Sequence, residues 1–151
     1  MTLYRMVPDV QTLIMAMLTR EFGRLLDDAE RAAARRRSAR AKLVTSAIEI
    51  VRRLPDEPVF RRVIDVDPEL LLPYLTDRFG STQHLAIAHV RDLLVEGMRD
   101  RSVRRADADV LATTLVLATT PFAVSAQAVA PSGREAILTE LERMIDSWLA
   151  P

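Results

Sequence analysis

The stretch that decides the fold is Val110–Ala130, VLATTLVLATTPFAVSAQAVA, because it carries no charged side chain. A helix that is apolar on nearly every side is either buried all round or lies in a membrane. The threonines, Ser125 and Gln127 keep its hydropathy low for a lipid-facing span, so we expect no membrane insertion. We expect a central helix that is bent at Pro121, ends at Pro131, and packs against its own chain and a partner subunit.

Composition indicates one helical domain. The chain has 151 residues, 49% of them hydrophobic, only four glycines and no strand-like alternation, which predicts an all-α antiparallel helical bundle. The absence of Cys excludes a disulfide framework, a thiolate nucleophile and Cys-based metal sites. The 21 basic and 21 acidic residues balance, which argues against strong nucleic-acid binding by this chain alone. Residues 1–20 lack the pattern of a signal peptide, so we expect a cytoplasmic protein.

Apolar residues recur every three or four positions along most of the chain, which predicts a series of amphipathic helices. We expect helices from 9 to as far as 37, from 38 to about 54, a short one opened by 56–58, and others over 67–79, 81–101, 107–130 and 132–149. Asp9, Ser38, Asp67 and Asp107 are the expected N-caps, and Ser132–Glu135 has the pattern of a capping box.

A basic run begins near the end of the first long helix and continues beyond it. Its members are Arg31, Arg35, Arg36, Arg37, Arg40 and Lys42. The simpler interpretation is a solvated helix end whose cations suit the helix dipole. The alternative is an anion or nucleic-acid contact, which is weaker because no aromatic side chain is interleaved for stacking.

The residues give little support for an enzyme. His84 and His89 are five positions apart, so on one helix they point about 140° away from each other. Neither has an acid three residues earlier, and no glycine-rich phosphate loop or nucleophile motif occurs. We therefore predict a protein that is not an enzyme and that uses no metal or cofactor.

Aromatic and methionine side chains have two interpretations. Ordinary core packing explains any one of them, whereas together they are also typical of an apolar ligand cavity with a few polar groups. The candidate effector-binding residues are Met15, Phe22, Phe60 and Met98 as walls, with Tyr74 and His89 as polar groups.

The last helix has an apolar stripe that is wider than one neighbouring helix needs. Two such helices from each subunit would form a four-helix interface across a twofold axis. We therefore predict a homodimer. The candidate interface residues are Leu111, Leu115, Ala118, Phe122, Leu141, Ile145 and Trp148.

The start of the chain suggests a family. Thr2-Leu3-Tyr4-Arg5 is followed after two residues by Pro8-Asp9, with Leu13 at the start of a long amphipathic helix. This run resembles the TetR (tetracycline-repressor) family of transcriptional regulators, in which the recognition helix of a helix-turn-helix precedes a short turn and a long helix. Val7 and Val10 differ from the Phe and Lys that are usual there. The resemblance covers only about the first 13 residues.

The resemblance implies a division of the chain and a function. Residues 1–8 would be the remnant of a recognition helix, with Thr2, Tyr4 and Arg5 at the DNA-contacting end, and residues 9–151 an effector-binding and dimerisation domain. A small apolar effector would move the helix that starts at Asp9, and so the spacing of two recognition helices that must match major grooves about 34 Å apart.

Operator DNA would then be a partner only of a full-length form. A recognition helix needs the preceding helix for support, so we expect that this chain alone cannot bind operator DNA tightly. Two other classes remain open. One is an all-α protein-interaction module without an effector, and the other is a helical-bundle enzyme or cofactor carrier.

Overall fold

A computed structural model describes residues 10–73, 78–125, 128 and 131–151. Within these ranges the chain forms six α-helices and two 3-10 turns and no strand, which confirms the predicted all-α helical bundle. Thr2, Tyr4, Arg5, Tyr74 and the Asp9 cap lie outside the described residues.

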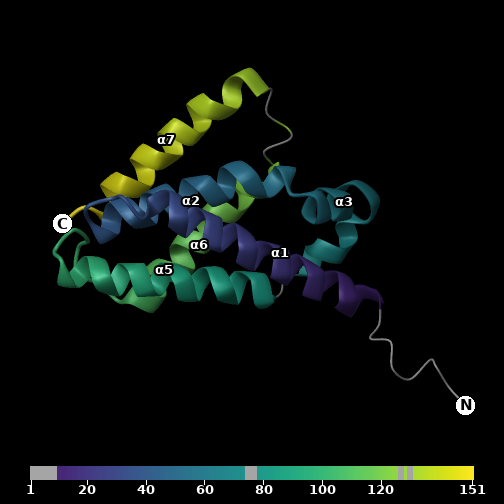
Figure 1. Cartoon of the computed structure of the whole chain (residues 1–151), viewed down its shortest axis with the longest axis horizontal. Coiled ribbons are helices and arrows are strands. Elements are labelled where there is room, and N and C mark those ends of the chain that lie inside the picture. The colour runs from purple at the N-terminus through teal and green to yellow at the C-terminus, as the bar shows by residue number, and fades with distance from the viewer. Residues whose placement is uncertain (1–9, 74–77, 126–127, 129–130) are drawn as a thin grey trace, which may run out of the picture.

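The helices follow one another with short connections. Their bounds are α1 Val10–Ala33, α2 Ala39–Arg53, the 3-10 turn η2 Leu54–Asp56, α3 Pro58–Val66, the 3-10 turn η3 Pro68–Leu71, α5 Ser81–Arg99, α6 Ala108–Ser125 and α7 Pro131–Leu149. Helix α1 runs between α2 and α5, and α7 packs on α2 (Figure 1). Helix α3 lies at one end of the bundle, and the C-terminus lies at the other.

Three of the predicted helix starts are confirmed. The Ser38 hydroxyl accepts a hydrogen bond from the Ala41 amide at 3.2 Å, so Ser38 is the N-cap of α2. One carboxylate oxygen of Asp107 accepts hydrogen bonds from the amides of Asp109 and Val110, at 2.9 and 3.1 Å, so Asp107 caps α6. Helix α5 begins at Ser81, within the predicted choice. The Ser38 and Asp107 side chains satisfy amides that the first turn of a helix leaves without a partner.

One predicted helix is too long, and another begins in a different conformation. Helix α1 ends at Ala33 rather than reaching Arg37, because the Arg36 amide bonds back to the Ala33 carbonyl in a turn toward α2. The helix expected from Asp67 begins with a 3-10 turn, Pro68–Leu71, and the Asp67 side chain makes no cap hydrogen bond. Pro73 has no N–H, so it cannot donate to the carbonyl of Glu69 four residues earlier. That carbonyl accepts a hydrogen bond from the Leu72 amide instead.

The prediction for the end of the uncharged stretch is wrong. Helix α6 ends at Ser125, and Pro131 opens α7 instead of ending the helix before it. Proline suits the first position of a helix because the amide it lacks has no partner there. Ser132–Glu135 consequently lie inside α7 and cannot form the expected capping box. Pro121 lies within α6, as expected.

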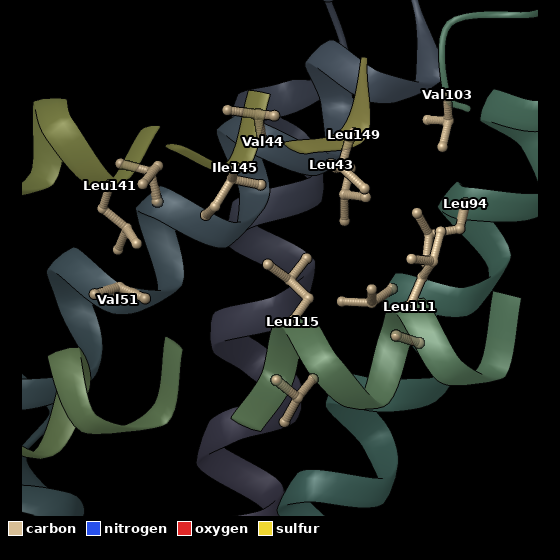
Figure 2. Packing of buried hydrophobic residues seen from close by; sticks show 14 of the residues in the cluster. Leu43, Val44, Val51, Leu94, Val103, Leu111, Leu115, Leu141, Ile145 and Leu149 are labelled. Atoms are coloured by element: carbon tan, nitrogen blue, oxygen red, sulfur yellow. The ribbon is translucent and has the colours of Figure 1, made fainter. Parts of the chain in front are cut away.

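The main core is built by four helices. Side chains of α2, α5, α6 and α7 converge in it (Figure 2); they include Leu43, Val44 and Val51, Leu94, Leu111 and Leu115, and Leu141, Ile145 and Leu149. Four predicted interface residues, Leu111, Leu115, Leu141 and Ile145, are at most 4% exposed here. Their apolar character is explained by the protomer's own core, so the expectation that a partner subunit covers them needs correction.

One end of the bundle is fastened by close packing and polar bonds. The backbone amide and Nε of Arg104 donate to the carbonyls of Leu149 and Trp148, both at 2.9 Å. The Arg104 guanidinium also lies 5.3 Å from the centre of the Trp148 ring. These contacts satisfy carbonyls that the end of α7 leaves without a partner, and they tie α7 to the loop that follows α5.

The same end joins α5 to the start of α2. The Asp100 carboxylate accepts from the amide of Ala39 at 2.9 Å and from the amide of Ser102 at 2.8 Å. The Ala39 amide, together with the hydroxyl of Ser102, lowers the pKa of Asp100 below its ordinary value of 3.8. We call this end, where α2 begins and α5 and α7 finish, the closed end.

Candidate functional site

The other end of the bundle contains an apolar cavity of about 150 Å³. Side chains of α1, α2, α3, α5 and α6 line it. It lies between the main core and a smaller cluster formed by Phe22, Leu25 and Leu26 of α1. Ala86 of α5 contacts both clusters and lines the cavity. Its small side chain leaves room where a larger one would fill the space between the two clusters.

The structure brings together four of the six predicted effector residues. Met15 and Phe22 of α1, Phe60 of α3 and His89 of α5 all line the cavity. Met98 is partly buried against the main core instead and is not part of the lining. That these residues bind an effector stays a prediction.

Sequence reasoning missed two threonines of α6 that line the cavity. Thr119 and Thr120 donate from their hydroxyls to the carbonyls of Leu115 and Val116, at 2.8 and 2.7 Å. Their protons are therefore used within the helix, and their oxygens can still accept. In the sequence these threonines only lower the hydropathy of the stretch, and the one signal of a further role is their recurrence along an uncharged helix.

The cavity also has acidic residues in its lining. Glu21 and Glu57 line it, and no Lys or Arg occurs among the described residues that do. Glu21 is paired with Arg20 and Arg24, each at 3.0 Å. The lining therefore offers negative charge and no cation, and the amide of Gln83 adds a group that can both donate and accept.

His89 is the most buried imidazole in the described part of the chain. Its side chain is 11% exposed, and its Nδ1 lies 3.0 Å from Oε1 of Glu30 on α1. Its Nε2 is buried and has no hydrogen-bond partner among the described residues. The ring of His84, by contrast, makes a T-shaped contact with Phe79 and does not line the cavity.

Three of the six members of the basic run pair with the chain's own acids. Arg31 pairs with Asp28, Arg40 with Asp146 at 3.2 Å and Lys42 with Glu96 at 2.9 Å, whereas Arg35, Arg36 and Arg37 are exposed. A hydrogen bond from Arg53, followed by one from Arg31, lowers the pKa of Asp28. This arrangement agrees with the interpretation of the run as a solvated helix end.

Helices α6 and α7 leave apolar side chains on the surface. Val110 and Leu117 of α6 are 60% and 53% exposed, and Ile137 and Met144 of α7 are 39% and 51% exposed. Of the remaining predicted interface residues, Ala118 is exposed, and Phe122 and Trp148 are partly buried against the core.

By length and composition α6 could cross a membrane. A single such helix is weak evidence, because the core helix of a soluble bundle passes the same test. Leu111 and Leu115 of this helix are buried in the main core. In the part of the chain that the structure describes, no group of three or more His, Asp or Glu side chains is placed to hold a metal ion.

Known proteins give a partial comparison. The chain is similar to uncharacterized HTH-type transcriptional regulators of Mycobacterium bovis and of the H37Rv and CDC 1551 strains of Mycobacterium tuberculosis. Each is 29% identical over 149 residues, which cover 98% of this chain and 76% of the relative. No family model matches the chain, and no solved structure matches it. The predicted role in transcription regulation agrees with these names at that coarse level.

Proposed function

We propose that this chain is the regulatory part of a TetR-like transcriptional repressor, which binds a small apolar effector and forms a homodimer. Its similarity to proteins named HTH-type transcriptional regulators supports the class. The apolar cavity between α1 and the rest of the bundle supports an effector, and it is the observation that carries the proposal. A cavity also favours this function over an interaction module with a fully packed core.

The position of α1 suggests how an effector acts. Met15, Leu18 and Phe22 of α1 form one wall of the cavity, and α1 follows the segment that resembles the end of a recognition helix. A ligand that fits one placement of α1 better than another stabilises that placement. In a dimer with complete helix-turn-helix heads, the shift changes the spacing of two recognition helices that must enter major grooves about 34 Å apart.

The homodimer rests on the exposed apolar residues of α6 and α7. A second copy that covers Val110, Leu117 and Met144 removes apolar surface from water, which is the main favourable term in association. The protein in this proposal is cytoplasmic and not an enzyme, and it contacts operator DNA only in a form with a complete DNA-reading head.

A cavity-filling variant tests the effector site. Toluene is a suitable probe because an apolar cavity of about 150 Å³ binds benzene. We expect saturable binding of toluene to the wild-type chain in ligand-detected NMR, and at least about a tenfold weaker affinity in Ala86→Met, because the new side chain occupies the cavity. Ala88→Met is the matched control, since Ala88 is exposed on the same helix. Equal binding by both variants, or none by the wild type, contradicts the proposal.

Sedimentation velocity at micromolar concentration tests the dimer. We expect a dimer for the wild type and a monomer for Leu117→Glu, because burying a carboxylate in an apolar interface is costly. Val66→Glu is the control: Val66 is 61% exposed but lies on α3, away from the proposed interface. A wild-type monomer, or a Leu117→Glu dimer as stable as the wild type, counts against this interface.

A further inference from the structure

We propose that the cavity selects a neutral apolar ligand that donates a hydrogen bond, an alcohol or a phenol, and that Nε2 of His89 accepts this bond. The inference rests on the proposed effector site and names the chemistry of its ligand. Glu30 is the positioning residue, because it determines which ring nitrogen of His89 carries the proton.

The contact with Glu30 fixes the tautomer of His89. Nδ1 lies 3.0 Å from a carboxylate oxygen, and two lone pairs at that distance would repel each other. Nδ1 therefore carries the proton, and in the neutral ring Nε2 is left as an acceptor. Buried polar atoms normally have a hydrogen-bond partner, and this Nε2 has none among the described residues. A ligand hydroxyl in the cavity would supply that hydrogen-bond partner.

Several other polar groups around the cavity accept hydrogen bonds, although the amide of Gln83 can also donate. The hydroxyl protons of Thr119 and Thr120 are used by backbone carbonyls, so only their oxygens remain. Glu21 and Glu57 add carboxylates, and no described lining residue is a cation. An anionic ligand would be buried beside these groups without a counter-charge, which is unfavourable. A ligand with a donor and no negative charge fits these acceptors.

The same pair of residues connects the ligand to α1. His89 lies on α5 and Glu30 on α1, so the imidazole stands between the cavity and the helix that the proposed mechanism moves. A hydrogen bond to Nε2 polarises the ring and strengthens the contact of Nδ1 with the carboxylate. A hydroxylated ligand therefore holds α1 against α5 more firmly than a hydrocarbon of the same size does.

Three probes of nearly equal size separate the possibilities, all measured on the full chain by ligand-detected NMR titration. Phenol donates a hydrogen bond, toluene makes none, and benzonitrile only accepts. The ratio of phenol affinity to toluene affinity is the readout. We expect this ratio to fall by about tenfold in His89→Phe, the effect of one lost hydrogen bond. His84→Phe is the matched control and leaves the ratio unchanged, since His84 does not line the cavity.

Glu30→Gln tests the positioning role. An amide can face Nδ1 with either its oxygen or its NH2 group, so both tautomers of His89 become accessible. We expect the preference for phenol over benzonitrile to shrink several-fold while toluene binds as before. Asp27→Asn is the control, because Asp27 is an exposed carboxylate of α1 that does not line the cavity and is not the acid that faces His89. Thermal melts establish that each variant is folded.

The outcomes distinguish this inference from the proposed function. Toluene binding with an unchanged phenol ratio in His89→Phe overturns the role of His89 and leaves the effector site standing. A wild-type preference for benzonitrile over phenol overturns the tautomer assignment. If the wild-type chain binds none of the three probes, both the site and the inference fall.

Discussion

The two ends of the bundle are built differently. At the closed end, Arg104 and Asp100 bond to backbone groups of α7 and α2, and Gly97 leaves no space for even a methyl group. At the α3 end, the short helices and turns between Leu54 and Leu71 help to enclose the cavity, and the small cluster around Phe22 packs apart from the main core.

The different packing of the two ends gives each end a different role. Close packing at the closed end fixes the relation of α2, α5 and α7, because tightly packed side chains transmit strain instead of absorbing it. The cavity end lacks such packing on the inner side of α1, so α1 can adjust there at lower cost. A ligand can therefore act on α1 while the closed end keeps the rest of the bundle in place.

The largest expected effect comes from deleting core volume in the two regions. Leu94→Ala should reduce the free energy of unfolding by about 2–5 kcal/mol, because Leu94 is fully buried in the main core and leaves a new cavity. Leu26→Ala, beside the existing cavity, should cost less, since Leu26 already lacks contacts on that side. Urea denaturation measures both. Equal losses would mean that the two ends are packed alike.

A second comparison uses two glycines. A Cβ at Gly97 would overlap the Cγ2 atom of Val103, so Gly97→Ala should destabilise the closed end by about 1–3 kcal/mol. At Gly23 of α1 a Cβ meets nothing within 4 Å, and Gly23→Ala should instead stabilise the fold by about 0.5–1 kcal/mol through helix propensity. Thermal melts of both variants test this. A stabilising Gly97→Ala would show that Val103 is free to move.

The sequence predicted what local chemistry determines. Ser38 and Asp107 were identified as caps because a short polar side chain before an apolar run has one favoured use, and both caps are present. Pro131 was assigned to the wrong helix, since proline both ends and begins helices and only the length of α6 decides which.

The candidate site was predictable in kind but not in detail. Met15, Phe22, Phe60 and His89 were grouped by chemical type, and the fold brings them together. The contribution of Glu30 depends on how α1 crosses α5, which no local pattern in the sequence specifies. Likewise, an apolar residue such as Ile145 gives the same signal whether its own core or a partner covers it; the fold places it in the core.

The smallest expected effect is electrostatic and lies at the closed end. Asp100→Asn should reduce the free energy of unfolding by about 1 kcal/mol at neutral pH. The substitution removes the negative charge of the side chain that accepts a hydrogen bond from the first amide of α2. The folded protein holds the pKa of Asp100 below its ordinary value of 3.8, so the stabilisation is fully present above that value. It is lost as the pH falls through the lower, folded value.

Urea denaturation at a series of pH values measures this effect. The difference in unfolding free energy between the wild type and Asp100→Asn should be constant above about pH 5 and shrink toward more acid conditions. Asp92→Asn is the control, because the Asp92 side chain is 80% exposed and lies 3.7 Å from the Arg91 guanidinium; exposed pairs of this kind contribute about 0–1 kcal/mol. A difference in unfolding free energy that grows at acid pH would contradict this prediction. It would mean that the loop after α5 does not fasten α2 through the charge of Asp100.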